Sequence, residues 1–77
     1  MGKRDFAIHV GQYRADVWDG PRGNLRVVVV DERRGSGPLV DALWTPRHGY
    51  HSDTGEGLCR RVLRSIDRAI REEIRDE

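Results

Sequence analysis

The last third of the chain carries apolar residues with the period of an α-helix. Winding Gly57 to Ile74 at about 100° per residue places one apolar set on a single face: Leu58, Cys59, Val62, Leu63, Ile66, Ala69, Ile70 and Ile74. This face covers roughly 160° of the circumference, the width expected of a surface helix that packs on a core. We therefore predict one amphipathic helix, with Leu63 and Ile66 as its main core residues.

Earlier in the chain, apolar residues recur at every second position, which is typical of half-buried strands. The first two segments of this kind are 5–10 and 13–18, and Gly11-Gln12 separates them. A two-residue turn that begins with glycine fits a type II′ hairpin, because that position needs a positive φ. The pairs expected in this hairpin are Phe6 with Val17, Ile8 with Ala15, and Val10 with Tyr13.

Two further strands are predicted at 25–30 and 39–45, after a turn-rich loop. The first contains four successive valines, so it is apolar on both faces. Such a strand is usually covered on both sides, whereas a single helix covers only one. We therefore expect Trp18, Val28 and Val30 to form a sheet face that a second copy or another protein covers. The side on which Trp44 lies depends on a register that the sequence leaves open.

These elements predict an α+β fold: a four-stranded antiparallel β-meander with one C-terminal amphipathic helix packed on one face. We expect all 77 residues to form one small domain. Its expected parts are a flexible N-terminus at 1–4, the sheet at 5–45, a polar connection at 46–53 and the helix at 54–75. Asp53 and Glu56 have the spacing of a helix-capping box at the start of that helix.

Arginine is the one unusual feature of the composition. The formal net charge is only +1, which argues against a general polyanion-coating protein, yet Lys3 is the only lysine among 14 basic residues. The helix arc opposite the apolar face holds nothing but arginines: Arg60, Arg61, Arg64, Arg68, Arg71 and Arg75. Guanidinium groups bind phosphates and carboxylates through paired hydrogen bonds. We therefore predict that this arc, with Arg33 and Arg34 in the loop 31–38, contacts nucleic acid or an acidic partner surface.

Two other interpretations of the arginine arc stay open. The side chains of a solvated helix face would lie over their own helix and pair with acids such as Asp67 and Glu72. A GC-rich genome would also favour arginine over lysine codons without any function.

The remaining reactive side chains form no pattern typical of a catalytic or metal site. His48 and His51 are followed by Asp53 and Cys59, and all four are zinc-ligand types. A structural zinc site, however, normally has paired ligands at both ends, and Cys59 is expected to be buried on the apolar helix face. We therefore expect no metal, no cofactor and no enzymatic activity.

Two functions follow from these observations. The first is a non-enzymatic binding module that holds nucleic acid or an acidic partner through the arginine arc. The second is a small regulator or inhibitor of a larger complex, acting through the exposed sheet face, which would also suit a two-fold homodimer. A single unpaired cysteine fits the reducing cytoplasm. Because no apolar run approaches the roughly 18 residues of a membrane span, and no signal-peptide pattern is present, we expect no membrane association.

Overall fold

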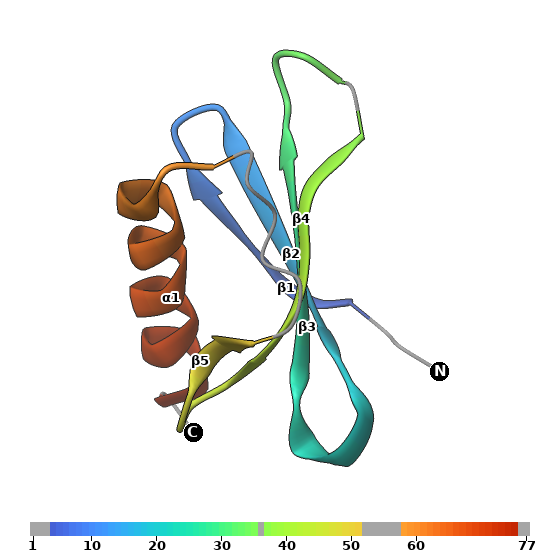
Figure 1. The fold of residues 1–77 in the computed structure, drawn as a ribbon, viewed down its shortest axis with the longest axis vertical. Helices are drawn as coiled ribbons and strands as arrows, with labels where there is room; N and C mark the ends of the chain where they lie inside the picture. Colours follow the sequence, from blue (N-terminus) through green and yellow to red (C-terminus); the bar gives the residue numbers. More distant parts are fainter. Residues whose placement is uncertain (1–3, 36, 52–57, 76–77) are drawn as a thin grey trace.

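A computed structural model of the protein describes residues 4–35, 37–51 and 58–75 (Figure 1). The elements in chain order are β1 (Arg4–Val10), β2 (Tyr13–Asp19), a short 3-10 turn η1 (Pro21–Gly23), β3 (Leu25–Asp31), β4 (Pro38–Thr45), β5 (Gly49–His51) and α1 (Arg60–Arg75). The strands form one antiparallel sheet in the order β1-β2-β3-β4-β5, and α1 packs on one of its faces. The predicted α+β class, the antiparallel meander and the C-terminal helix are confirmed.

The first hairpin has the predicted turn and register. Its cross-strand partners are Phe6 with Val17, Ile8 with Ala15, and Val10 with Tyr13. Gly11 has a φ of 59°, whereas Gln12 has a negative φ. A positive φ at the first turn position alone is what a type II′ turn requires, and glycine adopts it without steric strain. The alternation of the sequence and the chemistry of the turn therefore specify the same pairing.

The sheet has a fifth strand where the sequence analysis expected a polar connection. In β5, Tyr50 lies opposite Trp44 and His51 lies opposite Leu43. The turn before it is closed by His48, whose backbone N–H donates to Thr45 Oγ1 at 3.1 Å. With only three residues, β5 is too short to show an alternating pattern, so the prediction of four strands was wrong at this point.

The helix begins later than predicted. Leu58 and Cys59 are described but precede α1, which starts at Arg60. The carbonyl of Cys59 accepts a hydrogen bond from the backbone N–H of Leu63 at 3.2 Å, so Cys59 stands at the N-cap position. The predicted capping residues Asp53 and Glu56 lie outside the described residues.

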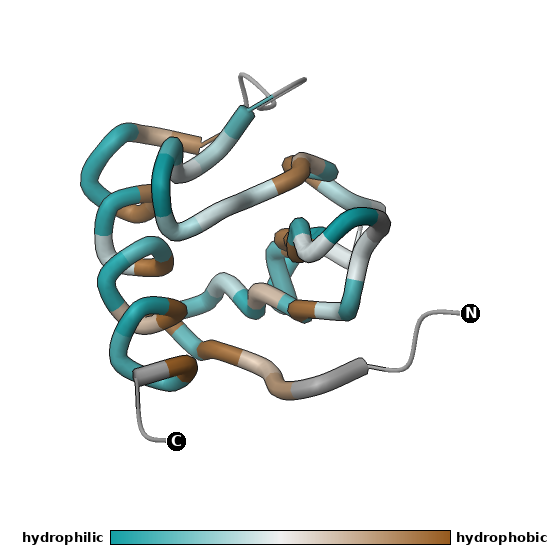
Figure 2. Tube along the Cα trace, turned by 90° about the horizontal axis from the view of Figure 1, so that it is seen from below, coloured by the Kyte–Doolittle hydropathy of each residue, from teal (hydrophilic) through white to brown (hydrophobic). Residues whose placement is uncertain are grey.

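The core lies between α1 and the facing side of the sheet. Its buried members are Ala15, Val17, Val27, Val29, Val40, Ala42, Trp44, Leu58, Ile66 and Ile70. Figure 2 shows the apolar segments of the helix turned toward the sheet. Ile66 is fully buried, as predicted, whereas Leu63 is half-buried at the edge of the core. Trp44 is also fully buried, so the structure places it on the helix side of β4.

A polar network fixes α1 to the β4–β5 hairpin. The indole N–H of Trp44 donates to Asp67 Oδ1 at 2.6 Å, and the Tyr50 hydroxyl donates to the Leu63 carbonyl at 2.8 Å. Arg71 donates from Nε to Asp67 Oδ2 at 3.0 Å and from Nη1 to the Pro46 carbonyl at 2.7 Å. Burial raises the pKa of Tyr50, and the charge of Asp67 adds to this shift. The phenol therefore stays protonated and available as a donor.

The sheet face opposite α1 is less apolar than expected. Val28 lies in register between Asp16 and Asp41, and its relative exposure is only 9%. Arg26 donates to both carboxylate oxygens of Asp41, at 3.0 and 2.7 Å. This hydrogen bonding outweighs the effect of burial and lowers the pKa of Asp41. Val28 is therefore largely buried within its own chain, which weakens the reason to expect a second molecule over it, and the partner face at Trp18, Val28 and Val30 stays a prediction.

We predict that Asp31 makes the fold sensitive to acid. Its side chain is 5% exposed and accepts hydrogen bonds from Gln12 Nε2 at 2.7 Å and from the backbone N–H groups of Arg33 and Arg34 at 2.9 and 3.2 Å. Although burial opposes the charged form, these bonds hold the pKa of Asp31 below its usual value. A lowered folded-state pKa stabilises the fold above the unfolded pKa of about 3.9, and this contribution is lost as the pH falls through the folded value.

The Asp31→Asn variant should therefore melt at a lower temperature than the parent at pH 7. The difference between the two melting temperatures should shrink below a pH of about 4. Thermal unfolding of both proteins, monitored by circular dichroism at pH 7 and at a pH below about 4, tests this prediction. An equally large difference at pH 7 and at low pH would show that the Asp31 charge contributes nothing.

Candidate anion-binding surface

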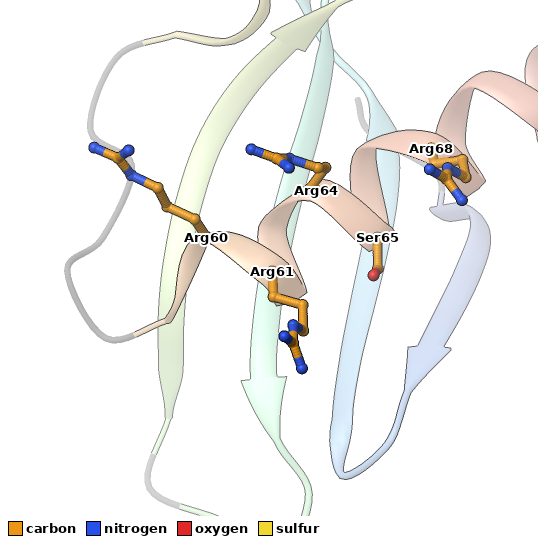
Figure 3. Close-up of a pocket in the computed structure, with 5 residues that line it drawn as sticks. All are labelled: Arg60, Arg61, Arg64, Ser65 and Arg68. Carbon is orange, nitrogen blue, oxygen red and sulfur yellow. The ribbon is translucent and has the colours of Figure 1, made fainter.

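Four arginines and one serine line a shallow hollow on the outer side of α1. The hollow has a volume of about 310 Å³, and we call it the arginine surface: Arg60, Arg61, Arg64, Ser65 and Arg68. Figure 3 shows Arg60 and Arg64 on one flank of the helix and Arg61 and Ser65 on the other. All five side chains are exposed. Within the described part of the chain, none of these arginines forms an ion pair with an acid.

Arg71 does not belong to this surface, although the helical projection grouped it with the others. Its guanidinium binds Asp67 and the Pro46 carbonyl, and its central carbon lies 5.1 Å from the centre of the Trp44 ring. Arg71 therefore joins the helix to the β4–β5 turn instead of remaining free for a ligand. Arg75 is the last residue of α1, and its side chain lies outside what the structure describes.

Several charges on α1 oppose the helix dipole, although Arg71 and Arg75 near its C-terminal end suit it. Arg60 and Arg61 occupy the first turn, which contains no acidic residue, while Glu72 and Glu73 are exposed near the other end. The N-terminus of a helix is positive and its C-terminus negative, so each such charge is unfavourable by about 0.3–1 kcal/mol at low salt. The arginine pairs four residues apart, Arg60 with Arg64 and Arg64 with Arg68, add repulsion. Helix stability therefore does not explain the arginines in the N-terminal half of α1.

Arg33 and Arg34 are exposed in the loop between β3 and β4, at the same end of the molecule as the start of α1 (Figure 1). Their backbone N–H groups donate hydrogen bonds to Asp31 Oδ1. The hollow on α1, however, is lined by helix residues alone. The structure thus places these two predicted residues near the same end without joining them to the arginine surface.

Among the described residues, the zinc-ligand candidates His48, His51 and Cys59 form no metal site. Cys59 is exposed, so the prediction that it lies in the core was wrong. The helical projection was extended past the start of α1, and the buried position belongs to Leu58, which is 8% exposed. Within 4–35, 37–51 and 58–75, no group of three or more His, Cys, Asp or Glu side chains is arranged to hold a metal ion. Asp53 lies outside these ranges.

Of the predicted partner-facing residues, Trp18 and Val30 are half-buried on the open sheet face. Ser65 was not predicted as part of any site. Its position on the helical projection, beside Arg61 and one turn from Arg68, is the signal that would have identified it.

No protein-family model matches this chain, and comparison with curated proteins and with solved structures found no significant similarity. In the described part of the chain, no helix has the length and apolar character needed to span a bilayer. The function therefore has to be inferred from the chemistry of the surfaces themselves.

Proposed function

We propose that this protein is a small non-enzymatic binding module that contacts nucleic acid through the arginine surface of α1. The observation that carries the proposal is the set of four exposed arginines without acidic partners among the described residues. A charged arc that only solubilised the helix would pair with nearby acids, as Arg71 does with Asp67. A bound polyanion would neutralise the repulsion within this arc and favour the positive end of the helix.

The spacing of the arginines suits a phosphate backbone. Arg60 and Arg68 are eight residues apart, which corresponds to about 12 Å along the helix axis. Phosphates follow one another every 3.4 Å or so along each strand of a duplex, so several lie within reach of the four guanidinium groups. With at most four contacts, we expect weak binding, in the range of about 10⁻⁶ to 10⁻⁴ M that is typical of non-specific association.

An acidic protein surface is the competing ligand for the same arginines. A protein partner presents carboxylates at irregular spacing and usually adds an apolar centre. The arginine surface offers no apolar side chain among its lining residues. This composition favours a ligand that is charged along its whole length.

The alternative function, a protein-binding regulator that uses the open sheet face, has weaker support. The centre of that face carries the paired side chains of Arg26 and Asp41, and Arg14 pairs with Asp16 at 3.2 Å. A partner would have to accommodate these charges, and charged groups are depleted from the centres of protein interfaces. The homodimer expected through the same face loses its main argument, because Val28 is nearly buried.

The test is a salt titration of binding to a labelled DNA duplex, measured by fluorescence anisotropy. If all four arginines contact phosphates, the logarithm of the affinity should fall with the logarithm of salt concentration at a slope of about −3.6. The double variant Arg60→Gln/Arg64→Gln removes two phosphate contacts, so it should make this slope shallower by about 1.8 and weaken binding at least tenfold or so at low salt. Its circular dichroism spectrum should match that of the parent, because both side chains are exposed.

The matched control is the double variant Arg22→Gln/Arg47→Gln. It removes the same charge from exposed loop positions toward the other end of the molecule (Figure 1). Its binding should stay within about twofold of the parent. Equal weakening by both double variants would reduce the effect to net charge and would contradict the proposed surface. Absence of any nucleic-acid binding at about 50 mM salt would contradict the function itself.

A further inference from the structure

The position of α1 in the fold bears on which form of nucleic acid, duplex or single strand, the arginine surface can contact. The helix forms one outer layer of the molecule, with the sheet behind it (Figures 1 and 2). Its 16 residues extend over about 24 Å. A helix is about 10–12 Å wide with its side chains, which fits the major groove of B-form DNA at about 12 Å but not the minor groove at about 6 Å.

The second observation is the distribution of side chains around the helix. Arg68 lies nearly opposite the buried pair Ile66 and Ile70 on the helical projection, so it marks the crest of the exposed side. Arg60 and Arg64 extend along one flank and Arg61 with Ser65 along the other (Figure 3). Donors on both flanks are what a helix needs when it lies between the two phosphate walls of a groove.

The acidic residues near the end of α1 determine which end of the helix can enter a groove of the duplex. The exposed residues Glu72 and Glu73 lie beyond the arginine surface toward the C-terminal end of α1. Carboxylates next to a phosphate wall are repelled, so this end of the helix is excluded from the groove. The favourable stretch, Arg60 to Arg68, measures about 12 Å and corresponds to three or four base pairs at about 3.4 Å each.

The fourth observation argues against a single strand. Proteins that bind single strands stack the bases on aromatic side chains. The lining residues of the arginine surface include no aromatic side chain. Trp44 is buried beneath the helix, and Trp18 lies on the sheet face opposite α1.

We propose that α1 inserts the arginine surface into the major groove of B-form DNA, with its N-terminal half leading and Arg68 nearest the base edges. This inference rests on the proposed function and names the ligand as duplex DNA. Arg60, Arg61 and Arg64 contact the phosphates of the two strands, and the Ser65 hydroxyl adds one uncharged donor. Arg68 reaches the floor of the groove, where guanine offers two acceptors to a guanidinium group.

The experiment compares three labelled probes of one sequence, about two helical turns long, at about 50 mM salt: a DNA duplex, an RNA duplex and a DNA single strand. The major groove of an RNA duplex is too deep and narrow for a helix to read. We therefore expect the full-length protein to bind the DNA duplex at least about tenfold more tightly than either other probe. A cationic dye that occupies the major groove should compete with the protein, whereas a minor-groove ligand should not.

Equal affinity for the RNA duplex or the single strand would overturn the groove assignment, as would competition by the minor-groove ligand. Either result would leave the proposed function intact, because nucleic acid would still be bound. Loss of the DNA preference in Arg68→Gln, with retention in the matched variant Arg22→Gln, would support the position of Arg68 at the floor of the groove. A DNA preference unchanged by Arg68→Gln would contradict that position. Failure to bind all three probes would overturn the proposed function together with this inference.

Discussion

Replacing Trp44 with alanine is expected to unfold the protein at room temperature. Trp44 is the largest fully buried side chain, and its ring packs between the sheet and α1. Truncating a buried tryptophan destabilises a protein by about 3–5 kcal/mol. A domain of this length has a net stability of roughly 3–5 kcal/mol. The variant also leaves Asp67 without its indole donor, which is held at 2.6 Å in the parent.

The matched control is Trp18→Ala, because Trp18 is the only other tryptophan and is half-buried on the open sheet face. Far-ultraviolet circular dichroism should show Trp44→Ala largely unfolded and Trp18→Ala folded. Urea titration should then place the midpoint of Trp18→Ala close to that of the parent. A cooperative melt of Trp44→Ala within a few degrees of the parent would contradict the position of this ring in the core.

Replacing Ile66 with alanine should cause the next largest loss of stability. Ile66 lies in the middle of α1 and has no exposed surface, so its removal leaves a cavity beneath the helix. The expected destabilisation is about 2–5 kcal/mol, and Ile66→Val should cost only about 0.5–1.5 kcal/mol. Because one kcal/mol shifts the melting temperature of such a domain by about 4–8 °C, thermal melts resolve the two variants.

The neighbouring variant Ser65→Ala serves as the control for the Ile66 series, since Ser65 is exposed on the same helix. Its melting temperature should stay near that of the parent. An Ile66→Ala protein as stable as the parent would mean that α1 does not pack on the sheet through this residue.

The elements with a clear period were predictable from the sequence. The alternation on each side of Gly11-Gln12 specifies the β1–β2 register, and the apolar face of 60–74 specifies which side of α1 is buried. In both cases the signal repeats several times within one element. The three residues of β5 repeat nothing, and they become a strand only because Tyr50 pairs with Trp44 and binds the Leu63 carbonyl.

Features that depend on contacts between distant segments were not predictable. Whether Val28 is covered depends on the alignment of Asp16 and Asp41 on the two neighbouring strands. Arg71 resembles the other helix arginines in sequence, and only the approach of the Pro46 carbonyl separates it from them. Of the candidate site, the sequence therefore predicted the exposed helix arc but not which of its arginines are already bound.

The arginines in the first turn of α1 oppose the helix dipole, so under the proposed function the protein would give up some stability in order to bind its ligand. Unfavourable electrostatic energy is stored between the first turn and the positive helix end while the surface is empty. A polyanion that binds there releases it, so occupancy and folding are thermodynamically linked. Acidic residues in the first turn would stabilise this helix, but they would also abolish its attraction for phosphate. Stabilising this protein by conventional surface design would therefore select against the binding that we propose.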